Sequence, residues 1–510
     1  MENNSRTGKS IKNVSYGLIV TVLNTLVSFA SRTVLVKTLG TEVLGINGLF
    51  TEVIAMISLA ELGVGMAIIY SLYKPLSEND LKKINQLMSL YRQAYNLIAI
   101  VTLVLGLFIT PFVHLLITDI DFPLHYIRFI FVLFVIKTAT SYLFSYKTSL
   151  LNADQKQYIV SIVSALVKFV STIVIIIILI LFKNYAQYLL LLIVQGLLTN
   201  IVLSKIVDKK YPFLDYKDKL SSKERKEILS NIENIFIKRL SSVITSSTDN
   251  ILISTLVSTI QVGLYSNYVV VFTVIRTLRQ QFINGIAASI GNLTVTSDAK
   301  HCIDVLHRLT YLFFVFGMVM ASGLMAALKP FITIWIGNEY LLADVIVYVA
   351  VLNLFIEICC DPLWQYLEVS GLFKQDRNIA LIGSSVNIVV SIILGMKIGI
   401  VGIFLGTVCT QVIQLILKTI LLFKHKFQQP SKCYMFMWVR MGISYIGLVI
   451  IQYLILRNVT FENLYLDFIL KGIISVFIAL ICSILLFIGT DEQKYLYSIV
   501  TKIKLKVLGE

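Results

Sequence analysis

Long apolar segments follow one another through the whole chain and are separated by short polar connections. A helix needs about 20 mostly apolar residues to cross the hydrocarbon of a bilayer. On this measure the sequence predicts fourteen transmembrane helices, of which the seventh and eighth are unusually polar. They lie at residues 14–36, 45–71, 87–114, 125–146, 158–182, 186–205, 228–252, 263–296, 309–334, 344–370, 379–396, 401–423, 438–456 and 466–489. We therefore expect an all-α integral membrane protein.

The distribution of charge supports this interpretation and gives an orientation. Only 14% of the 510 residues are charged, against about 25% in soluble proteins. With the N-terminus placed in the cytoplasm, the inner connections hold 28 Lys and Arg residues and the outer connections hold 4. Such an excess is the usual signature of cytoplasmic loops. It predicts a multi-pass protein of the cytoplasmic membrane with both termini inside, and it explains the net charge of +15 without a nucleic-acid partner.

The sequence offers no sign of a metal site, a disulfide framework or a cleaved leader. The six cysteines form no CxxC pair and have no His-rich neighbourhood, so zinc and disulfides are not expected. The first apolar segment is too long for the h-region of a signal peptide and no small-residue cleavage site follows it, so we interpret it as a retained helix. We expect no catalytic residues and no bound cofactor.

Several short patterns recur at a nearly constant offset, which indicates an internal repeat. Asn13 is matched by Asn231 and Gly45 by Gly263 at an offset of 218, and three further anchors follow at 219 or 220: Pro111 with Pro330, Tyr146 with Tyr366 and Gln155 with Gln375. Six helices per repeat predict two lobes of the same orientation, a plan found in several secondary transporters. The predicted parts are an N-lobe at 1–207, a basic cytoplasmic linker at 208–227, a C-lobe at 228–425, and two appended helices with a tail at 426–510.

Polar faces run along the first, seventh and eighth predicted helices, with side chains spaced three and four residues apart. Ionisable groups at this depth cost roughly 2.5–3.5 kcal/mol on insertion scales, so they usually face water or the interior of the bundle. The candidate cations of an aqueous cavity are Arg32, Lys137, Lys168, Lys238, Arg276 and Arg279. The candidate acids for ion coupling are Glu61, Asp249, Glu357 and Asp361.

Each candidate also has a structural interpretation. Lys168 lies close enough to the inner end of its span for its stem to snorkel, and Arg32 could anchor an interface. The acids could simply pair with the cations. If the cations line a cavity, their excess predicts an anionic guest, because Arg binds phosphate oxygens in a bidentate manner and Lys binds them as a point charge. A diphosphate between a lipid tail and a sugar would fit.

Residues Ser31–Ile84 carry the most distinctive motifs. These are LGxxxLGxNGLF at Leu39–Phe50, SLAELGVG at Ser58–Gly65 and SLYKPLSEND at Ser71–Asp80. The region resembles the opening of polysaccharide flippases from bacterial capsule and O-antigen loci. These proteins belong to the multidrug/oligosaccharidyl-lipid/polysaccharide exporter superfamily, whose plan of two six-helix lobes plus two helices matches the whole chain.

The resemblance implies a V-shaped bundle that works by alternating access. It also implies a polyprenyl-diphosphate-linked oligosaccharide repeat unit as cargo, carried from the inner to the outer leaflet for surface polysaccharide synthesis. Arg32, Lys137, Lys238 and Arg276 would line its cationic cavity, and coupling to H⁺ or Na⁺ would involve the embedded acids. Membrane lipids and the polymerase and glycosyltransferases of the same pathway are the expected partners.

Three other functions remain open. A peptidoglycan-precursor flippase has nearly the same chemistry. A cation-coupled multidrug exporter of the same superfamily would be expected to have an acidic or neutral cavity, against which the mid-span Lys and Arg argue. A membrane glycosyltransferase or polymerase would need a catalytic acid motif or a large soluble loop, and the longest polar connection, around Lys205–Lys226, has only about 20 residues.

Overall fold

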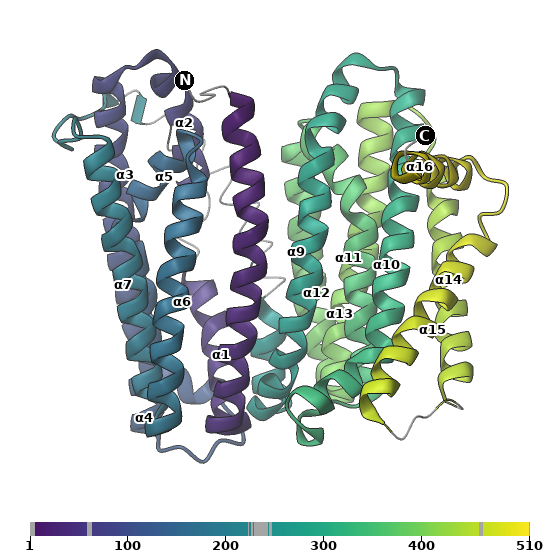
Figure 1. The fold of residues 1–510 in the computed structure, drawn as a ribbon, viewed down its shortest axis with the longest axis horizontal. Coiled ribbons are helices and arrows are strands. Elements are labelled where there is room, and N and C mark those ends of the chain that lie inside the picture. The colour runs from purple at the N-terminus through teal and green to yellow at the C-terminus, as the bar shows by residue number, and fades with distance from the viewer. Residues whose placement is uncertain are drawn as a thin grey trace. The chain divides into compact units, whose positions relative to one another are not determined.

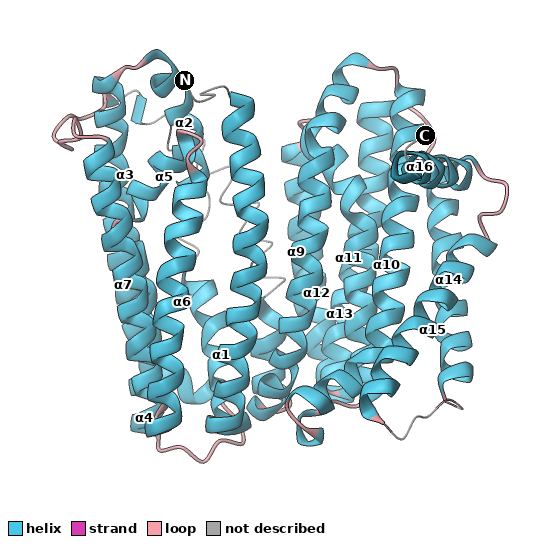
Figure 2. Cartoon of the chain, in the orientation of Figure 1, coloured by secondary structure: helices cyan, strands magenta, loops and turns pink. Residues whose placement is uncertain are grey.

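The computed structural model describes residues 6–58, 64–222, 224, 225, 228, 243, 247–457, 459 and 463–508. By internal contacts the chain divides into two compact units, Met1–Ser266 and Asn267–Glu510, called unit 1 and unit 2 below. The described residues form helices joined by loops, with no strand among them (Figure 2). The fold class predicted from the sequence is confirmed.

Figure 1 labels the helices of both units. Unit 1 contains α1 (Arg6–Ile57), α2 (Val64–Glu78), α3 (Leu81–Ile109), the 3₁₀ helix η2 (Thr110–Leu116), α4 (Leu124–Tyr142), α5 (Ser145–Ala153), α6 (Gln157–Phe182) and α7 (Tyr185–Lys210). Helix α9 (Thr259–Thr296) begins in unit 1 and continues into unit 2. Unit 2 then contains α10 (Ala299–Trp335), η3 (Asn338–Tyr340), α11 (Asp344–Val369), α12 (Phe373–Ile398), α13 (Ile400–Leu422), η4 (Phe423–Phe427), α14 (Lys432–Leu456), α15 (Leu464–Leu485) and α16 (Asp491–Leu508).

Eleven helical segments within the described residues are long and apolar enough to cross a membrane. They correspond to predicted spans 1, 3–6 and 9–14. Large apolar side chains on their outer faces are exposed, as at Phe108 and Leu181, both 69% exposed. Such surfaces are stable against lipid and not against water. The protein is therefore a multi-pass membrane protein.

The three remaining predicted spans have different outcomes. The span at 228–252 lies largely outside the described residues. The span at 263–296 is helical within α9, which is long but too polar to count among the eleven. The span at 45–71 is divided between the end of α1 and α2. Inside the predicted connection, two helical stretches of α1 meet at a kink at Gly40, which has φ 77° and ψ −176°, a conformation that glycine adopts without steric cost.

The helix boundaries follow the repeat offset found in the sequence. The stretch formed by α3 and η2 runs from Leu81 to Leu116, and α10 runs from Ala299 to Trp335, which are 218 and 219 positions later. Helix α4 begins at Leu124 and α11 begins 220 positions later. Equivalent parts of the two repeats therefore fold into equivalent elements, although α11 is continuous where its counterpart breaks at Phe144, which has a φ of 67°.

The repeat-related glycines Gly45 and Gly263 meet where α1 crosses α9, inside unit 1. A Cβ atom added at Gly45 would collide with the carbonyl oxygen of Thr259. One added at Gly263 would lie 2.5 Å from the carbonyl oxygen of Thr41 and 2.7 Å from the backbone nitrogen of Gly45. Thr41 and Thr259 are themselves 218 positions apart. The contact is thus reciprocal, as at a two-fold axis, and it depends on the small residues that let transmembrane helices approach closely.

The core of unit 1 is aromatic. Phe50 of α1 is fully buried, and its ring packs edge-on against Phe131 and Phe134 of α4, with centroids 4.9 and 5.7 Å away. Edge-to-face pairs of this kind stabilise by about 0.5–1.5 kcal/mol beyond their burial. This packing fixes the half of α1 that follows the Gly40 kink.

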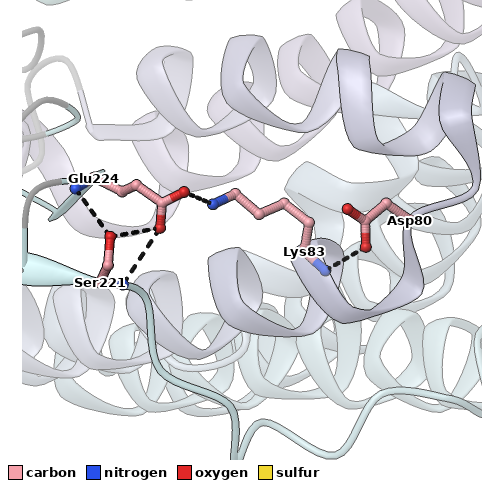
Figure 3. Close-up of polar contacts among 4 residues, drawn as sticks. All are labelled: Asp80, Lys83, Ser221 and Glu224. Carbon is pink, nitrogen blue, oxygen red and sulfur yellow. Dashed lines mark hydrogen bonds and ion pairs between the residues drawn. The ribbon is translucent and has the colours of Figure 1, made fainter.

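The polar segment after α7 is held against the start of α3. The Asn85 side chain donates to the carbonyl oxygen of Phe213 at 2.9 Å, and Ser89 Oγ donates to that of Tyr216 at 3.0 Å. Figure 3 shows the Lys83 ammonium pointing to the carboxylate of Glu224, which also accepts from the Ser221 hydroxyl. Part of the predicted linker therefore has a defined position on unit 1.

Candidate functional site

Arg32 lies on the polar face of α1 and is half-buried. Its guanidinium donates a hydrogen bond to Ser266 Oγ of α9. Tyr185 and Tyr188, one turn apart on α7, lie beside it, with their rings stacked at a centroid distance of 6.0 Å. Tyr188 is hydrogen-bonded to Ser31. Helices α1, α7 and α9 thus surround this cation with hydroxyl groups and aromatic rings.

Lys168 and Lys137 are half-buried in membrane-spanning helices of unit 1. Lys168, near the middle of α6, donates to Ser28 Oγ of α1 at 2.9 Å. Lys137 of α4 has its ammonium 5.1 Å from the centroid of the Phe134 ring. Within the described part of the chain the structure records no carboxylate beside either lysine. A hydroxyl group or a ring face lowers the energy of an ammonium, but neither neutralises it.

Four predicted residues come together in unit 2, between α9 and α11. Glu357 accepts from Arg276, with Nε to Oε2 at 3.1 Å, and pairs with Arg279, with Nη1 to Oε1 at 2.5 Å. Arg279 also pairs with Asp361, with Nε to Oδ2 at 3.3 Å. The side chains of Arg279 and Asp361 are only 13% and 14% exposed, whereas Arg276 is 40% exposed.

This network is formally neutral, because two guanidinium groups face two carboxylates. The sequence left two roles open for Glu357 and Asp361, ion coupling and structural pairing with the cations, and the structure shows them paired with Arg276 and Arg279. The i,i+3 spacing of the arginines and the i,i+4 spacing of the acids place each pair on one helix face. Arg276 is the more exposed member and presents the cationic side of the network to its surroundings.

The other predicted site residues lie apart from this network or outside the description. Lys238 and Glu61 lie outside the described residues. Asp249 is half-buried in unit 1, and the neighbouring Asn250 donates to Glu52 of α1 at 3.4 Å. Among the residues that the structure describes, no group of three or more potential metal ligands occurs.

Sequence reasoning missed Tyr185 and Tyr188 as neighbours of Arg32. Their i,i+3 spacing at the start of α7 was a usable signal for one helix face, but only the fold shows which face of α1 they meet. It also missed two ion pairs near helix ends, in each of which the lysine is buried. Lys147 pairs with Asp208 at 2.7 Å, and Lys418 pairs with Asp376 at 2.9 Å beneath the Trp364 ring.

Comparison with known proteins gives both a sequence match and fold matches. A family model described as polysaccharide biosynthesis protein matches residues 10–290. The structure of lipid II flippase MurJ in an inward closed conformation is 17% identical, with a TM-score of 0.69, covering 93% of this chain and 99% of that one. No match was found among curated proteins.

Two transporters of the MATE family have a similar fold. An inward-facing transporter assigned to the MOP superfamily is 14% identical with a TM-score of 0.60, covering 77% of this chain and 92% of that one. A mutant of the Vibrio cholerae MATE transporter VcmN is 13% identical with a TM-score of 0.56, covering 83% of this chain and 99% of that one. At these identities the likeness shows a shared fold.

Proposed function

The chain belongs to the polysaccharide biosynthesis protein family within the MOP flippase and exporter superfamily, and on this premise we propose that it flips a polyprenyl-diphosphate-linked oligosaccharide repeat unit. The cargo moves from the inner to the outer leaflet of the cytoplasmic membrane, by alternating access, for capsule or O-antigen synthesis. The protein performs transport and no covalent chemistry. Both termini lie in the cytoplasm, and the polymerase and glycosyltransferases of the pathway are its partners.

One observation carries this proposal: Lys137 and Lys168 lie within membrane spans without a recorded carboxylate among the described residues. An uncompensated ammonium at this depth is costly, and an anionic guest relieves that cost. Arg32 adds a guanidinium on a neighbouring helix, suited to bidentate contact with phosphate oxygens. The half-buried Tyr188 beside it supplies a phenol group for sugar hydroxyls, whereas the buried Tyr185 donates to Asn47 Oδ1 at 3.1 Å.

The network of unit 2 supplies a role for H⁺ or Na⁺ within the same proposal. Protonation of Glu357 or Asp361 would remove one of the negative charges beside Arg276 and Arg279 and would raise the net positive charge of the network. That charge would attract the diphosphate, whereas loss of the proton would favour its release. Cargo affinity and ion binding are then coupled, as reciprocal linkage requires. Asp249 and Glu61 remain candidates for the same role, and Lys238 remains a candidate for the cavity.

A peptidoglycan-precursor flippase is the second candidate. The fold likeness to lipid II flippase MurJ covers 93% of this chain, and both cargoes present a polyprenyl diphosphate. The family match to polysaccharide biosynthesis proteins favours the repeat-unit cargo.

Complementation of a deletion strain tests the proposal. Arg32→Gln and Lys168→Gln are expected to abolish surface polysaccharide and to leave the lipid-linked repeat unit in the inner leaflet. The matched control is Lys183→Gln, which removes an exposed lysine between α6 and α7 and is expected to complement fully. Immunoblots of membranes establish equal insertion. Normal surface polymer with both cavity variants would refute the anion-binding assignment, and rescue of a lipid II flippase mutant instead would favour the second candidate.

A further inference from the structure

A cavity of about 640 Å³ lies within unit 2, between α10, the start of α11, α14 and α15. Its volume falls within the range of about 300–1,000 Å³ that is typical of small-molecule sites. None of the site residues predicted from the sequence lines it. Two of its walls, α14 and α15, are the helices that have no counterpart in the internal repeat.

The walls of the cavity are held together by a buried polar cluster. Gln452 of α14, which lines the cavity, donates to the carbonyl oxygen of Ser322 of α10 at 2.9 Å. Ser322 Oγ lies 2.9 Å from Gln452 Oε1 and 2.8 Å from the carbonyl oxygen of Ser475 of α15. All three residues are at most 4% exposed. Because this cluster joins all three helices, the cavity is preformed.

Three cations and two carboxylates line the cavity. Lys471 pairs with Asp467 at 2.8 Å one turn away on α15, and Lys329 pairs with Asp344 at 3.6 Å. Arg457, at the end of α14, has no ion pair recorded within the described part of the chain. Among the described residues that line the cavity, one guanidinium charge is therefore in excess, on the side chain that best matches the geometry of a phosphate group.

The depth of the cavity indicates where its ligand resides. It lies where α10 ends at Trp335, α14 ends at Leu456 and α15 begins at Leu464. The ends of spanning helices lie at the level of lipid headgroups. By the predicted orientation this is the outer leaflet.

We propose that this cavity binds the phosphodiester headgroup of an anionic lipid. Arg457 holds the phosphate, and the carboxylates of Asp344 and Asp467 accept hydrogen bonds from headgroup hydroxyls. The same carboxylates repel a second negative charge, so the site selects a singly charged diester over a phosphate monoester. Tyr348 and Tyr453, which also line it, add amphipathic rings suited to this depth. This site is distinct from the proposed cargo site and does not depend on the identity of the cargo.

Lipid retention by the full-length protein tests the proposal. The purified protein is titrated with phosphatidylglycerol or phosphatidylcholine in detergent, and bound lipids are measured by native mass spectrometry. Arg457→Gln is expected to weaken phosphatidylglycerol binding about tenfold and to bring it close to the weaker binding of phosphatidylcholine. Asp344→Asn removes the partner of the exposed Lys329. This variant is expected to strengthen phosphatidylglycerol binding.

The matched control is Arg440→Gln, which makes the same charge change on α14 at the opposite end of the helix. Equal loss with Arg440→Gln and Arg457→Gln would overturn the proposal, because binding would then reflect overall charge. Equal retention of the two lipids by the native protein would also overturn it. A third arm adds sn-glycerol 3-phosphate; if it binds as tightly as the lipid, a soluble phosphate replaces the lipid as ligand and the assignment to a headgroup is refuted.

Discussion

A charged side chain inside a membrane span needs a counter-charge, water or a guest. In unit 2, Arg279 of α9 meets this need through Glu357 and Asp361 of α11. In unit 1, Lys137 and Lys168 have only a ring and a hydroxyl group recorded beside them among the described residues. This difference predicts different consequences of removing charge at the two places.

Asp361→Asn is expected to lower the melting temperature in detergent, because it leaves Arg279 with one carboxylate in a buried setting. Breaking a fully buried pair costs about 3–5 kcal/mol. The remaining contact with Glu357 places the expected loss below that range. The measurement is a thermal melt followed by light scattering.

The double variant Arg279→Gln with Asp361→Asn separates a structural role from a transport role. If the pair serves stability alone, the double variant recovers both the melting temperature and surface polysaccharide. If it serves ion coupling, the melting temperature recovers while export does not. If neither the melting temperature nor surface polysaccharide recovers, Arg279 and Asp361 do not form the ion pair that the structure shows.

Lys137→Met is expected to keep or raise the melting temperature, because it removes an uncompensated charge while retaining the apolar stem. Export of the repeat unit should nevertheless be lost. Sites that serve function commonly reduce stability in this manner. A variant that is clearly destabilised and still exports would show that Lys137 is a structural residue.

At the scale of helices, the crossing of α1 and α9 depends on two residues without side chains. Gly263→Ala is expected to destabilise the protein by about 1–3 kcal/mol, as overpacking does. The new Cβ would meet backbone atoms of Thr41 and Gly45, which cannot move aside like the end of a side chain. Thermal melts in detergent measure the loss.

Gly196→Ala in α7 is the matched control, since nothing lies within 4 Å of the position its Cβ would take. Alanine there should stabilise the helix by about 0.5–1 kcal/mol. Equal behaviour of the two variants would show that α1 and α9 do not touch at Gly263.

Helix α16 lies across the ends of the spanning helices of unit 2 (Figure 1) and is attached through Glu492. This carboxylate pairs with His307 Nδ1 of α10 at 3.3 Å, and the hydrogen bond from His307 lowers the pKa of Glu492 from 4.5 to about 2. A lowered carboxyl pKa contributes stability that is complete above about pH 4.5 and disappears as the pH falls toward 2.

Glu492→Gln is therefore expected to expose α16 to limited proteolysis at pH 7. The difference in melting temperature between the native protein and the variant should shrink as the pH falls from 4.5 toward 2. A difference that stays constant over this interval would show that the carboxylate charge does not hold the helix.

At the scale of the whole molecule, the predicted orientation is tested by cysteine labelling. Asn184→Cys, in the exposed connection between α6 and α7, should react with a membrane-impermeant maleimide in intact cells. Asp215→Cys, in the segment after α7, should react only after permeabilisation. The native protein is the control, since the exposed Cys433 is predicted to lie inside. The reverse labelling pattern would show that the predicted orientation is inverted, and with it the proposed direction of transport.

Much of this architecture is readable from the sequence because lipid imposes simple rules. Eleven predicted spans coincide with long apolar helices, and the offset of about 219 reappears in the helix boundaries. The motifs at Leu39–Phe50 led to the correct superfamily. The connection predicted between the first two spans contains the break at Gly40, where two helical stretches of α1 meet at a kink.

The sequence by itself determined that the chain spans a membrane in two related halves, since hydrophobic length and backbone hydrogen bonding leave no other stable fold for it. Only the tertiary structure decided which charges meet. Arg279 and Asp361 are 82 positions apart, and their pairing depends on which faces of α9 and α11 pack together. The lipid-headgroup cavity likewise exists only because α14 and α15 close against α10, an arrangement set by side-chain packing and invisible to hydropathy.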